Sequence, residues 1–145
     1  MIQEGGLRAP ERKSLEIESL KFWDNDDLDK ELRRQFDVCH SCRRCFNLCD
    51  SFPKLFDLID ESESMELDSV SSKNFKPVVD ACTLCDMCFM VSCPYVPPHE
   101  FAIDIPSLFI RYKAQNKKNN FLEEQLSKTD FNGKIGLKFP RVLNW

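Results

Sequence analysis

The sequence lacks several features by which common functions are recognised. It has no uninterrupted run of about 18 apolar residues, the length that a membrane-spanning helix requires. It contains no GxGxxG motif and no phosphate-binding loop, so no nucleotide or flavin site is indicated. Its basic residues form no patch and its net charge is −4, which argues against a nucleic-acid partner. No nucleophile stands beside an acid or base, so we expect no catalytic residue.

The N-terminal stretch MIQEGGLRAPERKSLEIESL has no apolar core of the kind that a signal peptide needs. We therefore expect the protein in the cytoplasm, or at the inner face of the membrane through partners. In a secreted chain, the eight cysteines would first suggest four disulfides. In a reducing compartment, metal ligation is the better explanation of so many cysteines.

The apolar residues that are present follow a helical period. Leu28, Leu32, Phe36 and Cys39 recur at spacings of four, four and three, which places them on one helix face. The acidic segment before Leu28 offers an N-cap at Asp24 or Asn25. The fold class that we predict is therefore mainly α.

Shorter helices are expected elsewhere in the chain, each near a cysteine run or a proline. They begin at Pro53, around Phe75 and at Pro106. We expect a loop over 60–74, extended chain over PYVPPHE (94–100), a break at 114–120 and a short strand at KIGLKF near the end. In domain terms, residues 1–24 form an arm, 25–128 the helical domain and 129–145 a tail.

All eight cysteines fall in two short runs, each preceded by a predicted helix. The first run is Cys-x2-Cys-x2-Cys-x3-Cys, and the second is Cys-x2-Cys-x2-Cys-x4-Cys followed by Pro94. Three cysteines at intervals of three residues can wrap one cubane cluster and bind three of its irons. The fourth ligand then comes from the other run, as in two-cluster ferredoxins. The candidate ligands are Cys39, Cys42, Cys45 and Cys93 for one [4Fe–4S] cluster, and Cys82, Cys85, Cys88 and Cys49 for the other.

The main alternative to two clusters is zinc. Zinc sites pair two CxxC units around one tetrahedral ion, whereas here a third cysteine follows after only two residues in both runs. The runs also depart from the ferredoxin pattern, because Asp50 follows Cys49 and the second run has an extra residue before Cys93. The extra residue leaves open a three-iron cluster at one site.

Several residues near the cysteines are candidates for supporting roles. Arg43 and Arg44 lie within the first run, where positive charge favours a reduced cluster, so we expect the first cluster to have the higher potential. The alternative is that both arginines face solvent or a partner. A further set comprises Phe46 and Phe89 as shields of the clusters from water, His40 as a minor alternative ligand and His99 as a hydrogen-bonding loop residue.

These stretches resemble a known family. CHSCRRCFNLCDSFPKLFDLID, FKPVVDACTLCDMCFMVSCPYVPPHEFAIDIP and SLFIRYKA are similar to the N-terminal half of heterodisulfide reductase-related iron–sulfur oxidoreductases, which resemble the iron–sulfur subunit of anaerobic glycerol-3-phosphate dehydrogenase. The resemblance covers about residues 30–115. It implies an α-helical ferredoxin with two [4Fe–4S] clusters that relays electrons within a larger redox complex, in some relatives towards membrane quinones.

The chain departs from that family after the second run. Family members usually continue into a second half with further cysteine-rich repeats, but this sequence has no cysteine after Cys93. We therefore expect it to correspond to the ferredoxin half alone, as an electron-transfer subunit or domain that docks on a dehydrogenase or reductase. A free-standing ferredoxin carrier and a zinc-stapled interaction module are the alternatives.

Overall fold

Helices account for 62% of the residues that the computed structural model describes, namely 10–117 and 121–138. No strand occurs in these two ranges. The prediction of a mainly α protein is therefore confirmed. The chain divides into two compact units after Gln115, and each is described by itself.

The longest helix, α1 (Asn25–Cys42), follows the predicted period. Its N-cap is Asp24, whose carboxylate accepts hydrogen bonds from the backbone N–H groups of the first turn. Leu28, Leu32 and Phe36 are buried along one face. The helix ends within the first cysteine run, so its last turn carries two of the candidate ligands.

Prolines mark the starts of the shorter helices. Pro53 lies in the first turn of α2 (Ser51–Asp60), and Pro106 is the second residue of α4 (Ile105–Gln115). A proline in the first turn loses no helical hydrogen bond, so each helix begins just before its proline. The third short helix is α3 (Lys76–Asp80), which leads into the second cysteine run as predicted.

The acidic segment between α2 and α3 is a loop with two short 3-10 turns, η2 (Leu67–Ser69) and η3 (Ser72–Phe75). Arg33 of α1 holds this loop. Its guanidinium donates to the carbonyl oxygens of Leu67 and Val70, both at 3.0 Å. The loop is therefore anchored to the helix that carries the first cysteines.

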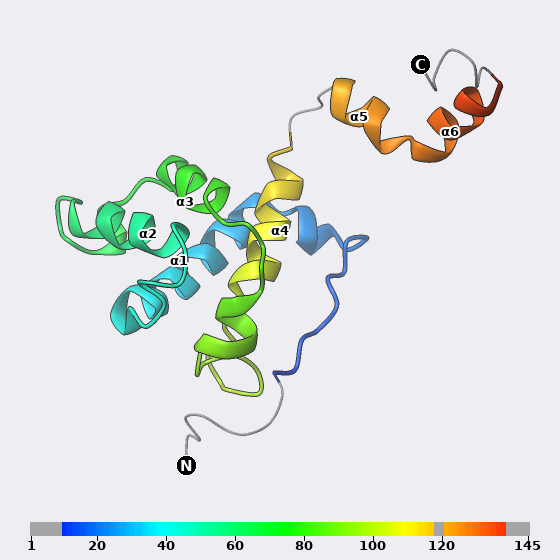
Figure 1. Ribbon diagram of the computed structural model, residues 1–145. Helices are drawn as coiled ribbons and strands as arrows, with labels where there is room; N and C mark the ends of the chain where they lie inside the picture. The colour runs from blue at the N-terminus through cyan, green and yellow to red at the C-terminus, as the bar shows by residue number, and fades with distance from the viewer. Residues whose placement is uncertain (1–9, 118–120, 139–145) are drawn as a thin grey trace. The chain divides into compact units, whose positions relative to one another are not determined.

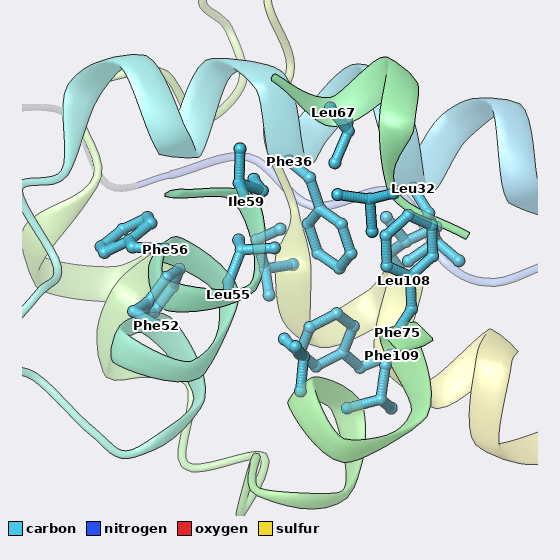
Figure 2. Packing of buried hydrophobic residues seen from close by; sticks show 14 of the residues in the cluster. Leu32, Phe36, Phe52, Leu55, Phe56, Ile59, Leu67, Phe75, Leu108 and Phe109 are labelled. Atoms are coloured by element: carbon cyan, nitrogen blue, oxygen red, sulfur yellow. The ribbon is translucent and has the colours of Figure 1, made fainter. Parts of the chain in front are cut away.

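Phenylalanine forms the centre of the first unit (Figure 2). Phe36 of α1 packs edge to face against Phe75 at 5.1 Å and against Phe109 of α4 at 5.9 Å between ring centroids. The buried set comes from α1, α2, α3, α4 and the turns between them. This core fixes the ends of the helices from which both cysteine runs extend.

The segment before α1 is tied to α4, which lies against α1 (Figure 1). It ends in a 3-10 turn, η1 (Leu20–Trp23), with Phe22 buried. Arg111 of α4 is itself buried and donates to the carbonyl oxygen of Phe22 at 2.8 Å and to the carboxylate of Asp27 at 2.9 Å. The part of the predicted arm described here, from residue 10 onward, is thus irregular chain that becomes ordered on the helical core; the part before residue 10 lies outside the described residues.

Two predictions of local structure are wrong. The PYVPPHE stretch is a series of turns and not extended chain, because His99 donates its N–H to the carbonyl of Val96 at 2.9 Å. Proline presets the backbone for such turns as readily as for extended chain. KIGLKF is not a strand either, since it lies in α6 (Thr129–Lys138) as far as residue 138.

The second unit contains α6 and a shorter helix, α5 (Phe121–Ser127). The break expected at 114–120 begins where α4 ends at Gln115, and its residues 118–120 lie outside the described ranges. In α6, Phe131 and Ile135 are four residues apart, a helical spacing that outweighs the alternation of apolar residues in KIGLKF. Neither helix contributes a buried residue, so the described part of this unit has no core of its own.

Candidate metal centre

The first cysteine run begins inside α1 and turns sharply out of it. Cys39 and Cys42 occupy the last turn of the helix, and Arg43 ends it in the left-handed conformation with φ 51°. The N–H of Arg43 still donates to the carbonyl of Cys39 at 2.8 Å. Two tight turns follow, one on each side of Cys45. The run ends at Cys49, the residue just before the N-cap of α2.

The second run also contains a left-handed residue directly after its second cysteine. Asp86, which follows the second cysteine of its run as Arg43 does in the first, is also left-handed with φ 68°. Leu84 has φ 57°, so this loop turns twice. A π-helical turn, η4 (Cys88–Ser92), then leads to Cys93, whose N–H donates to the carbonyl of Cys88 at 2.9 Å. Because a positive φ is uncommon in residues other than glycine, its presence in both runs indicates that each loop has a defined backbone conformation.

The two loops enclose two hollows between them. The first has a volume of about 300 Å³, part of it open to solvent, and its lining includes four cysteines from both runs: Cys39, Cys42, Cys45 and Cys93. Cys93 thus lines a different hollow from the three cysteines that precede it in its own run. The first hollow brings together one of the two sets of four predicted from the sequence.

The second hollow has a volume of about 330 Å³ and takes the other four cysteines. Its lining includes Cys49, Cys82, Cys85 and Cys88. Phe52 of α2 contributes to both linings, so the two hollows are neighbours. Each hollow is therefore lined by three cysteines of one run and one cysteine of the other.

Among the described residues, the cysteines that line each hollow do not converge on a site for one metal ion. All eight cysteines are free thiols. Within the described ranges, no three histidine, cysteine, aspartate or glutamate side chains converge closely enough to hold one metal ion. A tetrahedral zinc ion needs four ligands around a single centre, whereas a cubane takes one thiolate at each of four separate irons.

Burial and repulsion between neighbouring thiolates raise the pKa of Cys39, Cys45 and Cys88 in the absence of a metal. Burial raises the pKa of Cys45 to about 11 and that of Cys88 to about 12, and neighbouring thiolates add to both shifts. The same causes raise the pKa of Cys39 well above its ordinary value. A metal that binds here must displace protons, so its affinity depends on pH.

Positive charge lies beside each hollow. Arg44 lines the first and opposes the rise in the pKa of Cys45 and Cys93. Lys113 of α4 has the same effect on Cys82, and its ammonium donates to the carbonyl of that residue at 2.8 Å. No pattern in the sequence indicated Lys113, because it lies far along the chain from the second run.

The two arginines of the first run have different surroundings. The guanidinium of Arg43 binds the carboxylate of Asp60 at the end of α2, with one hydrogen bond of 2.9 Å, and lies over the ring of Phe56. Only Arg44 contributes to the lining of the hollow. We predicted both arginines beside one cluster. The structure gives them different contacts, with Asp60 and Phe56 for Arg43 and with the first hollow for Arg44.

Backbone N–H groups point at several of the sulfur atoms. Leu84 donates to the sulfur of Cys82 at 3.4 Å. The N–H groups of Tyr95 and Val96 likewise lower the pKa of Cys93, opposing the larger effect of burial. Such donors stabilise a thiolate, and they follow from loop conformations that the residue types do not reveal.

The histidines lie outside both linings. His40 has its Nε2 atom 3.0 Å from the carboxylate of Asp60, so the structure gives no support to its role as a ligand. His99 accepts a hydrogen bond from the N–H of Phe101 at 3.1 Å, as expected of a hydrogen-bonding loop residue.

The two candidate shielding residues also differ from each other. Phe89 is buried, with 3% of its surface exposed. Phe46 is 48% exposed and stacks on Phe56, with ring centroids 6.2 Å apart. Neither ring contributes to the lining of a hollow, so their role as shields stays a prediction.

Comparison of the chain with protein families, curated proteins and solved structures gave no match. Among the described helices, none has the length and apolar character needed to cross a bilayer. The functional argument therefore depends on the two hollows and their cysteines.

Proposed function

We propose that this chain is an electron-transfer protein that holds two [4Fe–4S] clusters, one in each hollow. The single observation that carries the proposal is the division of the eight cysteines into two linings of four, with one cysteine exchanged between the runs. This is the ligation scheme of two-cluster ferredoxins. It uses every cysteine of the chain.

The arrangement favours clusters over zinc. Zinc sites pair two CxxC units around one ion, whereas in both runs of this chain a third cysteine follows after only two residues. Four thiolates brought to one hollow from both runs suit a body with a metal at each corner. Bound clusters would supply one-electron chemistry, accepting and releasing electrons without a substrate site.

The chain's own residues hold and tune the two sites. The phenylalanine core fixes the end of α1 and the start of α2, so the sulfurs keep their positions. Phe52 contributes an apolar side chain to the lining of both hollows. Arg44 and Lys113 offset the negative charge that four thiolates bring together.

We propose further that the chain belongs with the heterodisulfide reductase-related iron–sulfur oxidoreductases, acting in the cytoplasm. Its role there is to relay electrons as a subunit or domain of a dehydrogenase or reductase complex, as an α-helical ferredoxin. The second unit favours a docked subunit over a free carrier, since its apolar side chains are exposed on both described helices. A carrier has no use for an apolar surface of this kind.

The proposal is tested by anaerobic purification with iron and sulfide analysis, followed by EPR of the dithionite-reduced protein. We expect brown protein with about eight irons and eight sulfides per chain. Colourless protein that binds two zinc ions would refute the proposal and favour the interaction module. Size-exclusion chromatography with candidate redox partners then separates a docked subunit, which coelutes with a partner, from a free carrier, which does not.

A further inference from the structure

An arginine far from both cysteine runs reaches the second one. Arg12 donates to both carboxylate oxygens of Asp86, at 2.7 and 2.8 Å. Its other edge donates to both carboxylate oxygens of Asp104, at 2.8 and 3.0 Å. The guanidinium therefore joins the second cysteine loop to the start of α4, where Asp104 also accepts from the N–H of Ser107.

Two more contacts hold Arg12 in place. Its guanidinium carbon lies 3.9 Å from the centroid of the ring of Phe89, which is buried beneath it. The preceding residue, Glu11, donates its N–H to the carbonyl of Pro97 at 3.1 Å. The N-terminal segment thus packs against the second loop and against the turns that follow its last cysteine.

Asp86 is the member of this group closest to the metal chemistry. It follows Cys85, contributes to the lining of the second hollow and has a left-handed backbone that fixes its direction. The two hydrogen bonds from Arg12 pair this carboxylate with a guanidinium, which offsets its negative charge. A lone carboxylate beside a cluster opposes the extra negative charge of reduction, whereas a carboxylate paired with Arg12 does so much less.

We propose that Arg12 sets the reduction potential of the cluster in the second hollow, by neutralising Asp86 and holding it against α4. The inference rests on the proposed function, because it needs a cluster in that hollow. Arg12 does not touch the sulfurs, so it is a positioning residue. Its counterpart at the first hollow is Arg44, which comes from within the cysteine run itself.

The test is an EPR-monitored redox titration of the full chain with its clusters loaded. Arg12→Ala should make reduction of one cluster at least threefold less favourable. At 59 mV per tenfold change in the equilibrium constant for one electron, this lowers its midpoint potential by at least about 28 mV. Asp86→Asn should raise the same midpoint, because it removes the negative charge and leaves Arg12 bound to Asp104. Arg12→Lys keeps the charge and should recover most of the shift.

Opposite shifts separate tuning from loosening of the loop. A purely structural role would move the midpoint in the same direction in Arg12→Ala and Asp86→Asn, and that result would overturn the inference. So would midpoints unmoved by Arg12→Ala in protein with full iron. Lys21→Ala is the charge-matched control, because it removes one positive charge from an ion pair of the first unit, that with Asp27, and Lys21 lines neither hollow. It should leave both midpoints unchanged.

A second measurement does not depend on the clusters. Hydrogen exchange of the Glu11 amide should be slow in the wild type and fast in Arg12→Ala, because the hydrogen bond to Pro97 depends on the anchored arginine. Equal exchange in both proteins would overturn the anchoring. Wild-type protein without iron would instead refute the proposed function, and the exchange result would remain as evidence for the contact.

Discussion

Two double substitutions with the same number of cysteines test the exchange between the runs. Cys42→Ala with Cys93→Ala removes two sulfurs from the first hollow and leaves the second intact. Cys42→Ala with Cys49→Ala removes one sulfur from each hollow. In the first variant the lost cysteines come from different runs, whereas in the second they come from the same run.

The expected iron content follows from the linings. The first variant keeps Cys49, Cys82, Cys85 and Cys88 together, so it should retain one cluster, with about four irons and four sulfides per chain. The second variant has no hollow with four sulfurs. It should therefore lose every intact four-iron cluster and hold at most iron-deficient ones.

The assay is iron and sulfide analysis with EPR of the reduced proteins, loaded under the same conditions. Circular dichroism of both variants checks that the helices persist, and wild-type protein with about eight irons sets the scale. If each cluster used one run only, the pattern would reverse. An intact cluster in the Cys42/Cys49 variant and none in the Cys42/Cys93 variant would therefore refute the exchange.

Three further outcomes are expected. Phe36→Ala should lower the free energy of unfolding, measured in urea, by about 3–5 kcal/mol, because Phe36 is fully buried. Phe46→Ala, at a half-exposed site, should lower it by less than about 1 kcal/mol. Equal losses would contradict the described core. In metal-free protein, the raised pKa values of Cys45 and Cys88, about 11 and 12, mean that the folded state holds these protons more tightly than the unfolded one, whose thiols titrate near 9.0. The contribution of these two thiols to the unfolding free energy should then be constant below about pH 9 and fall as the pH rises from 9 towards 12, and urea titrations that show a rise over that range would refute this. Arg44→Ala should lower the midpoint of the first-hollow cluster in a redox titration, and an unmoved midpoint would remove Arg44 from its tuning.

The features predicted best from the sequence are those that depend on spacing. The interval of four between Leu28, Leu32 and Phe36 is a property of helix geometry, and all three residues are buried on α1. The two sets of four cysteines were predicted from this kind of spacing together with the ligation pattern of two-cluster ferredoxins, and the linings of the two hollows group the cysteines in the same way. Neither inference needs knowledge of contacts between distant segments.

The features missed depend on loop conformation or on contacts between distant segments. Leu84 and Asp86 adopt positive φ although neither is a glycine, so no residue type signalled these turns. Arg12 and Lys113 reach the second loop from opposite ends of the first unit. The strand expected near residue 135 failed for a different reason, since a short run with alternating apolar residues also fits a helix.

The fate of Arg43 shows why adjacency to a cysteine does not establish a role in tuning. The left-handed turn that ends α1 sends its guanidinium towards Asp60, and this pairing holds the pKa of Asp60 at about 2. An arginine neutralised by its own carboxylate adds little net field at the hollow, whereas Arg44 has no such ion pair among the described residues. Arg43→Ala is therefore the matched control for Arg44→Ala, because one arginine is lost from the same loop in each case. We expect Arg43→Ala to shift each midpoint potential by less than about 18 mV, which corresponds to a change of about twofold in the equilibrium constant for one-electron reduction. Equal shifts from the two variants in a redox titration would show that charge in the loop matters irrespective of where it points, and would contradict the assignment made from the hollow's lining.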